Sequence, residues 1–492
     1  MKQKTHKTEK FPIAFFLVFI SFALFIIPFS FLPGKLRLFP SLRLFILDVF
    51  NNDSSQKIEI TDNSTLNNNI EKLEKSLNQM QSAGPIDSSS QQVETKKPNP
   101  VKTGEPKKFD SEFLQFYCRK GSEDGCKLWT LDNFYNSLRQ TGNNKKTTII
   151  SYFGDSIISR DKITSQLREN FQNKFGNSGP GYFLMQKLWK WTGHKQVYFY
   201  ENGWKAFTIL NPVLKSDKYG FGGIVSRTIG PGAYTEFKIR EDLTSVNRIS
   251  VFYITHPEGG KLQIKVDGQL VKSTDTRQNK QIIKKLTSEA RGKIWRVESG
   301  KGGVVQIAGV SLENDKPGVI VDAISLTGGR LIHLTNSNQN HYARAVALRH
   351  PQLMILHFGV NEVDTGMRED YAPKAITMLK HLLASNKQMS CLIMGPTDKV
   401  TKSGGEYHTL NIIKEIIKVQ KSIARRSGCA FFNSWKAMGG EASIVAWHNH
   451  RPRLAVSDLT HITDAGGEKM ASILYVNLIK GYLEYLKGKR SK

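Results

Sequence analysis

Short apolar runs alternate with amphipathic helical patterns from about residue 111 to the end of the chain. The run KKTTIISYF (145–153) predicts a buried strand, and the apolar residues after it recur every four positions, which predicts an amphipathic helix. Further helical patterns run from Leu410 to Ile423 and from Asp464 to about Leu486, the latter with Thr463 as its N-cap. Four later runs resemble the first strand: 318–326, 351–359, 390–396 and 428–435.

Strands that alternate with helices in this way are typical of a parallel sheet covered by helices on both faces. The pattern therefore predicts an α/β domain made of two stretches of chain, residues 111–196 and 315–492. In such domains the functional residues gather at the carboxyl ends of the strands.

Residues 197–314 interrupt the alternation with strand patterns and glycine-rich turns. The stretch KLQIKVDGQLVKS (261–273) has apolar residues at every second position and an Asp-Gly turn, which predicts a hairpin. Similar runs lie on either side of it, so we expect a β-sandwich inserted between the first helix and the second strand of the α/β domain.

The N-terminal region carries an uncharged apolar stretch, residues 11–33, which is long enough to cross a bilayer. A cleaved signal peptide would be shorter and would show a small-residue cleavage site, and a buried core helix of this uninterrupted length would be rare. We therefore expect residues 1–34 to form a cytoplasmic tail and a single transmembrane anchor. Lysines before the stretch favour a cytoplasmic N-terminus, although three basic residues after it oppose this orientation: Lys35, Arg37 and Arg43. The remainder of the chain would then be periplasmic or extracellular.

Residues 35–110 begin with a segment that could lie along the membrane interface and continue as a polar stretch too poor in apolar residues to fold alone. We predict an interfacial segment followed by a disordered linker. Within it, helical spacing leaves open a short self-associating helix, which would be marginal at this length: Ile70, Leu73, Leu77 and Met80.

Composition adds two constraints. The formal net charge is +27, but the basic residues are scattered and form neither an arginine-rich stripe nor zinc-finger spacing, so a basic surface for anionic polymers or membranes is favoured over nucleic-acid binding. The four cysteines include no Cys-x-x-Cys pair, which argues against a structural zinc site. Their pairing is possible outside the cytosol, but the spacing does not require it.

Candidate catalytic residues stand where the predicted strands end. Ser156 follows the first strand in a Gly-Asp-Ser tripeptide, and Asp458 and His461 precede the last helix. A serine hydroxyl needs a base to become a nucleophile, which His461 could supply while Asp458 orients its imidazole. Backbone N–H groups of Ser156 and Gly328 and the side-chain amide of Asn361 could form an oxyanion hole.

In this order, Gly154-Asp155-Ser156, Gly328, Gly359-Val360-Asn361-Glu362 and Asp458-Leu459-Thr460-His461 resemble the four blocks of the SGNH or GDSL-like hydrolases. The resemblance covers about residues 145–487 and implies a flavodoxin-like three-layer α/β/α domain with a Ser-His-Asp triad. FGNSGPGYF (175–183) and GVIVDAISLTGG (318–329) are similar to a branch of periplasmic peptidoglycan O-acetylesterases, which implies a carbohydrate-binding-like insertion. Ile157 departs from the histidine common in that branch, and Glu362 departs from the aspartate of the broad family.

The remaining candidates have simpler interpretations. His448 and His450 could ligate a metal, but no third ligand is evident, which favours a loop near the site. Asp155 is expected to support the serine turn, and Asp161 to cap or pin the following helix. Three tryptophans either stack on sugars or pack in the core: Trp189, Trp191 and Trp204.

The sequence thus favours an extracytoplasmic serine esterase that deacetylates peptidoglycan or another polysaccharide, needs no cofactor or metal, and binds no nucleic acid. An O-acetyltransferase with the same triad is the first alternative. A non-catalytic, membrane-tethered glycan-binding scaffold is the second, and a lipase is disfavoured because no apolar lid is evident. The oligomeric state is left open.

Overall fold

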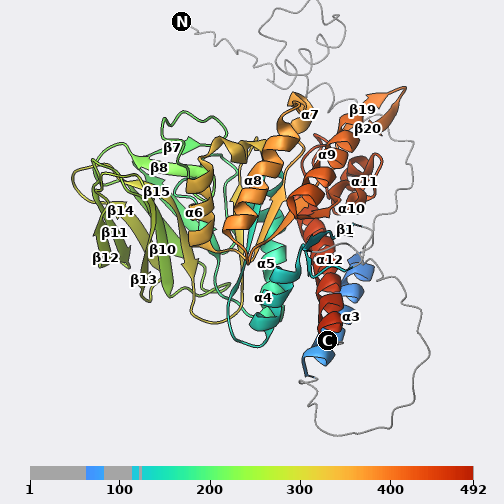
Figure 1. The fold of residues 1–492 in the computed structure, drawn as a ribbon, viewed down its shortest axis with the longest axis horizontal. Helices are drawn as coiled ribbons and strands as arrows, with labels where there is room; N and C mark the ends of the chain where they lie inside the picture. The colour runs from blue at the N-terminus through green and yellow to red at the C-terminus, as the bar shows by residue number, and fades with distance from the viewer. Residues whose placement is uncertain (1–62, 83–112, 121–124, 491–492) are drawn as a thin grey trace, which may run out of the picture. The chain divides into compact units, whose positions relative to one another are not determined.

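The computed structural model describes residues 63–82, 113–120 and 125–490, in which a six-stranded sheet forms the centre of the α/β part (Figure 1). Its strands lie in the order β1-β21-β18-β17-β4-β16, all parallel except β1 at the edge. Taken in chain order, the parallel strands are arranged 2-1-3-4-5, which is the flavodoxin-like order. Their bounds are β1 Leu114–Gln115, β4 Thr148–Gly154, β16 Val319–Ser325, β17 Leu353–His357, β18 Ser390–Met394 and β21 Ala430–Phe432.

Helices cover both faces of this sheet because its buried strands point alternate side chains to opposite sides. Tyr152 packs with α4, α5 and α12, whereas the next residue, Phe153, lies in the core formed with α6, α8 and α9. The predicted α/β class with a parallel sheet is therefore confirmed. The helices are α4 Asp132–Gly142, α5 Lys162–Phe175, α6 Gln339–Arg349, α8 Tyr371–Ser385, α9 Asn411–Ser427 and α12 Asp464–Arg490.

Shorter elements connect these layers. As predicted, Thr463 caps α12, since its hydroxyl accepts a hydrogen bond from the backbone N–H of Gly466 at 3.1 Å. The short elements are η3 Ser156–Asp161, η4 Leu331–Asn336, α7 Glu362–Thr365, α10 Ser434–Met438, α11 Ser443–Asn449, and the hairpins β2 Cys118–Lys120 with β3 Leu128–Trp129 and β19 Val400–Ser403 with β20 Glu406–Thr409.

Between α5 and β16 the chain forms two antiparallel sheets, which we call the inserted module (residues 181–313). Side chains of both sheets, such as Val251 and Phe237, share one core, so the sheets pack face to face. One sheet contains β5 Gly181–Phe183, β7 Trp204–Thr208, β8 Ile224–Thr228, β10 Arg248–Ile254, β13 Ile283–Glu289 and β15 Gln306–Glu313. The other contains β6 Val197–Asn202, β9 Tyr234–Ile239, β11 Lys261–Val266, β12 Gln269–Asp275 and β14 Ile294–Ser299.

The inserted module begins earlier than the boundary expected at residue 197. The short strand β5 pairs with β15, but its glycine-rich sequence has no apolar alternation to reveal it. The predicted Asp-Gly hairpin is confirmed as β11–β12, and both turn residues, Asp267 (φ 46°) and Gly268 (φ 84°), have the positive φ that this tight turn requires.

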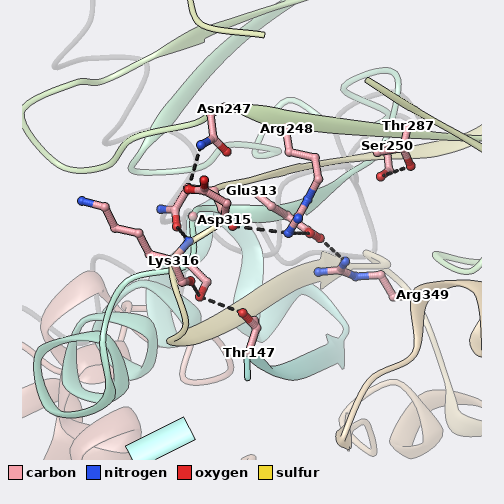
Figure 2. A network of polar contacts seen from close by, with 12 residues as sticks. Thr147, Asn247, Arg248, Ser250, Thr287, Glu313, Asp315, Lys316 and Arg349 are labelled. Carbon is pink, nitrogen blue, oxygen red and sulfur yellow. Dashed lines mark hydrogen bonds and ion pairs between the residues drawn. The ribbon is translucent and has the colours of Figure 1, made fainter. Parts of the chain in front are cut away.

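A buried polar network joins the inserted module to the central sheet. The guanidinium of Arg349, at the end of α6, donates to Asp322 on β16 at 2.7 and 2.9 Å and to Glu313 on β15 at 2.5 Å. Figure 2 shows Glu313 between Arg349 and Arg248 of β10, which donates to it at 3.2 Å. Burial alone would raise the pKa of Glu313, but the two arginines hold it below its usual value. The module is therefore fixed to the α/β part by charge-assisted hydrogen bonds as well as by apolar packing.

Helix α3 (Asn63–Ser82) corrects part of the linker prediction for residues 35–110. Its apolar stripe packs on α12 of the same chain, with Leu66 fully within the core and Ile70 and Leu73 beside it. Tyr475 of α12 also donates to Glu74 at 3.4 Å. The apolar spacing thus covers a neighbouring helix, which supplies the burial that an isolated helix would lack.

The predicted membrane anchor, residues 11–33, lies outside the described residues. Within the part of the chain that the structure describes, no helix combines the length and the apolar character needed to cross a bilayer.

All four cysteines form disulfides. Cys118 is paired with Cys126 in the β2–β3 hairpin, and Cys391 of β18 is paired with Cys429, just before β21. The second pair lies in the core between neighbouring strands of the central sheet.

Candidate active site

Ser156 lies at the carboxyl end of β4, where the strand order reverses between β16 and β17. Such a switch point leaves a crevice outside the strand ends, since the chain departs to opposite faces of the sheet on either side. Asp155 shapes the turn, because its carboxylate accepts a hydrogen bond from the backbone N–H of Ile157 at 2.9 Å. This is the supporting role expected for Asp155, and it presents Ser156 at the first position of η3.

The structure brings Asp458 and His461 to this serine from 302 and 305 residues away. The Ser156 hydroxyl donates to His461 Nε2 at 2.8 Å, and His461 Nδ1 donates to Asp458 Oδ2 at 2.7 Å. The other oxygen of Asp458 accepts from the backbone N–H groups of Thr460 (3.0 Å) and His461 (2.9 Å), so a tight turn holds the pair in place. Partial burial would raise the pKa of Asp458, but the hydrogen bonds from His461 keep it below its usual value.

The proposed oxyanion donors lie in the two loops that flank Ser156. Gly328 follows β16 with a φ of +77° and open space where a side chain would point. Asn361 follows β17, and its amide donates to the carbonyl of Gly329 at 3.0 Å, which ties the two loops together. The Asn361 amide also interacts with the buried carboxyl group of Asp155, which it stabilises in the ionised form.

Glu362 has a role that sequence reasoning did not identify. It is fully buried, and its Oε1 accepts from the backbone N–H of Leu331 (3.1 Å) and from the hydroxyl of Tyr371 (2.8 Å). These contacts join α7, η4 and α8 behind the Gly328 loop. The longer glutamate at this position therefore spans a gap between elements that hold the site.

Asp155 and Glu362 form a pair of buried carboxyl groups beneath the serine turn. One oxygen of each, Asp155 Oδ2 and Glu362 Oε2, has no hydrogen-bond partner. Burial, with a smaller contribution from the charge of Glu362, raises the pKa of Asp155 to about 7, and burial also raises the pKa of Glu362. The ionised forms of both groups are thus disfavoured in the folded protein.

This burial predicts a pH dependence of stability. Because the folded protein keeps a proton on Asp155 that the unfolded chain releases near pH 3.8, the contribution of Asp155 is fully present below that pH and is lost as pH rises through about 7. The Asp155→Asn variant, which cannot titrate, should therefore gain on the parent by up to about 4 kcal/mol over this interval. Urea unfolding at several pH values measures the difference.

The exposed Asp217→Asn variant serves as the control for the same substitution away from the site. A difference for Asp155→Asn that is constant between pH 4 and pH 7 would contradict a raised pKa of Asp155.

Asp161 pins the helix after the serine turn, as expected, but it does so through Arg168 and makes no side-chain cap of α5. The Arg168 guanidinium donates to both oxygens of Asp161 at 2.8 and 3.1 Å, and both side chains are buried. Asp161 also accepts from the backbone N–H of Lys195 at 3.1 Å, and His194 Nε2 lies 3.7 Å away. Burial lowers the pKa of His194 to about 3, so this imidazole is neutral. No local pattern signals His194 and Lys195, because they reach Asp161 through tertiary contact.

The remaining candidates are placed as follows. His448 and His450 lie on and just after α11 and contact different backbone carbonyls, those of Ala455 (3.3 Å) and Pro452 (2.9 Å). Among the described residues, no group of three histidine, cysteine or acidic side chains is arranged to hold a metal ion. Of the tryptophans, Trp204 is buried in the inserted module, Trp189 is partly buried, and Trp191 is 51% exposed.

The fold is similar to that of a solved enzyme structure. A peptidoglycan O-acetylesterase structure aligns with a TM-score of 0.61 and 20% sequence identity over 71% of this chain and 96% of that one. The aligned part of this chain therefore has the same fold as that structure.

Two further structures align only weakly. They are a family two carbohydrate esterase from Cellvibrio japonicus (TM-score 0.20, 11% identity, 48% and 88% of the two chains) and an acetyl xylan esterase (0.24, 18%, 32% and 79%). No protein-family model and no curated protein sequence matches this chain.

Proposed function

We propose that this protein is a serine esterase that removes O-acetyl groups from peptidoglycan or another polysaccharide. The observation that carries the proposal is the unbroken hydrogen-bonded series from Ser156 through His461 to Asp458, with distances of 2.8 and 2.7 Å. These are the contacts that a hydroxyl nucleophile, its general base and an orienting carboxylate require. The fold shared with a peptidoglycan O-acetylesterase supports an acetylated glycan as the substrate.

In the first half of the reaction, the Ser156 hydroxyl attacks the acetyl carbonyl as His461 Nε2 takes its proton. Asp458 stabilises the imidazolium that results. The oxyanion of the tetrahedral intermediate would accept hydrogen bonds from the N–H groups of Ser156 and Gly328 and from the side-chain amide of Asn361. The ester bond then breaks, the sugar oxygen takes the proton from His461, and Ser156 carries the acetyl group.

In the second half, His461 takes a proton from a water molecule, whose oxygen attacks the acetyl-serine. Breakdown of the second intermediate releases acetate and returns the proton to Ser156. His461 and Asp458 have 38% and 47% of their side chains exposed, so water reaches the base readily. This exposure favours hydrolysis over transfer to a sugar hydroxyl, because an acyltransferase must keep water from the acyl-enzyme.

We further propose an extracytoplasmic location, with residues 11–33 as a membrane anchor. The pairing of all four cysteines supports it, since structural disulfides persist in oxidising compartments and are rare in the cytosol.

Acetate release tests the proposal directly. We expect the purified protein to release acetate from O-acetylated polysaccharide and from p-nitrophenyl acetate, and to release none from polysaccharide that was first deacetylated with alkali. Added deacetylated glycan should leave the yield of free acetate unchanged. If acetyl groups instead appear on the added glycan, the protein is a transferase, and if neither ester reacts, the esterase proposal is wrong.

A further inference from the structure

Among the residues that the structure describes, the exposed aromatic side chains lie within one short stretch of the chain. Trp191, Tyr198 and Tyr200 have 51%, 52% and 57% of their surface exposed. The other large apolar residues exposed among the described residues are aliphatic and scattered from position 213 to 456. Single exposed apolar residues are common on protein surfaces, but a group of aromatic rings within ten residues is not. We call these three residues the aromatic platform.

Tyr198 and Tyr200 face solvent because of the strand that carries them. Along β6, Val197 and Phe199 point into the core of the inserted module, so the residues between and after them point outward. β6 is also the edge of its sheet and pairs only with β9. Both rings therefore stand side by side, about 7 Å apart along the strand, on an open sheet face.

A cation lies over one face of each ring of the platform, which leaves the other face for a ligand. Lys190 Nζ lies 5.4 Å from the Trp191 ring centre, the Arg240 guanidinium 5.9 Å from that of Tyr198, and Lys187 Nζ 5.5 Å from that of Tyr200. On the neighbouring strand, Lys238 is the register partner of Tyr198 and Glu236 that of Tyr200. Flat rings are thus bordered by long polar side chains of both signs.

The segment that carries Trp191 is tied to the serine turn. Residues 186–196 of the inserted module approach Asp161. Asp161 ends η3 and lies five residues after Ser156. Asp161 accepts the backbone N–H of Lys195, and the carbonyl of Lys195 accepts from Arg240, the cation beside Tyr198. The platform therefore extends from the neighbourhood of the serine turn along the outer edge of the inserted module.

We propose that the aromatic platform binds the glycan strand of the substrate at sugars beyond the acetylated one. Aromatic rings present a negative face on which the C–H faces of sugar rings stack, and the bordering lysines, arginine and glutamate can hydrogen-bond hydroxyl and charged groups. This inference takes its substrate class from the proposed esterase function. It assigns the platform to chain binding, away from the bond that is cleaved.

A membrane surface could also attract aromatic and basic residues, but the platform is less suited to it. Glu201 lies next to Tyr200 in the chain and Glu236 lies opposite it, and an anionic bilayer would repel both. Carboxylates beside aromatic rings suit a sugar, because they accept hydrogen bonds from its hydroxyl groups.

The test compares long and short substrates. In the Trp191→Ala/Tyr198→Ala/Tyr200→Ala variant, we expect KM for acetylated polysaccharide to rise about tenfold or more, because Trp and Tyr are enriched among the residues whose truncation weakens binding most. The kcat/KM for p-nitrophenyl acetate should stay within about twofold of the parent, since this ester is too small to reach the platform. The matched variant with phenylalanine at all three positions should retain most of the polysaccharide activity. Leu270→Ala, an exposed residue on β12 at the opposite edge of the same sheet, is the control.

Binding is measured separately in a Ser156→Ala background, by sedimentation with insoluble peptidoglycan and by affinity electrophoresis in soluble acetylated xylan, so the result does not depend on turnover. Loss of glycan binding in the triple-alanine protein supports the platform even if no ester proves to be a substrate. Unchanged binding and unchanged KM overturn it. Loss of binding to phosphatidylglycerol vesicles with glycan binding retained would overturn it in favour of a membrane surface.

Discussion

Replacing Ser156 with alanine is expected to reduce acetyl-ester hydrolysis by about four orders of magnitude or more. The hydroxyl that contacts His461 Nε2 at 2.8 Å supplies the atom that would carry the acetyl group in the proposed reaction. The measurement is the rate of p-nitrophenolate release, together with mass spectrometry of a quenched reaction for an acetylated Ser156 peptide in the parent.

The matched control is Ser403→Ala, which removes an exposed hydroxyl from the β19–β20 hairpin and should leave the rate unchanged. Both variants should unfold at the temperature of the parent, because neither side chain fills a core. A Ser156→Ala protein that retains even a tenth of the parent rate would show that the nucleophile is another group.

The second large effect is on stability. Changing Arg349 to methionine should lower the free energy of unfolding by about 3–5 kcal/mol, because Asp322 would be left as a buried charge without its partner. Asp322 also accepts hydrogen bonds from Ser151 (2.6 Å) and from the backbone N–H of Tyr182 (2.9 Å). An unpaired charge on Asp322 would therefore destabilise both the central sheet and β5. Denaturant unfolding followed by tryptophan fluorescence measures the change.

Two comparisons sharpen this prediction. Arg368→Met, which alters an exposed arginine with 89% of its side chain accessible, should change stability by less than about 0.5 kcal/mol. Adding Asp322→Asn to Arg349→Met removes the uncompensated charge and should recover part of the loss. If Arg349→Met alone is as stable as the parent, the network does not hold the two parts together.

The features that sequence reasoning located are those with a local signature. Buried strands show as apolar runs, so β4, β16, β17 and β18 could be assigned, and the Asp-Gly pair marked the turn of the β11–β12 hairpin. Ser156 could be found because it directly follows such a run, at the carboxyl end of a parallel strand, where functional residues gather. The Asp458–His461 pair lies between α11 and α12, away from any strand end, and could be found through its resemblance to the last block of the SGNH-like hydrolases.

The features that were missed depend on distant contacts. No pattern in the sequence around Glu362 indicates that this residue is buried. Its burial is explained by the hydrogen bonds that it accepts from Leu331 and Tyr371. His194 and Lys195 lie far from the serine in any local pattern and reach Asp161 through the path of the inserted module. Helix α3 was assigned to a linker because its stripe is too sparse to fold alone, and α12 supplies the missing surface.

The inserted module and α6 share an apolar core, which limits the substitutions that either can accept. Phe221 and Ile254 of the module belong to the same core as Tyr342 and Val346 of α6, and the Tyr342 hydroxyl donates to the carbonyl of Phe221 at 2.9 Å. A module joined in this way cannot be replaced without changing the helix that it packs on. Replacing the module with a similar one would leave apolar side chains of the new module and of α6 exposed to solvent, because their surfaces would no longer match. A substitution on one side of this contact therefore requires a compensating substitution on the other side.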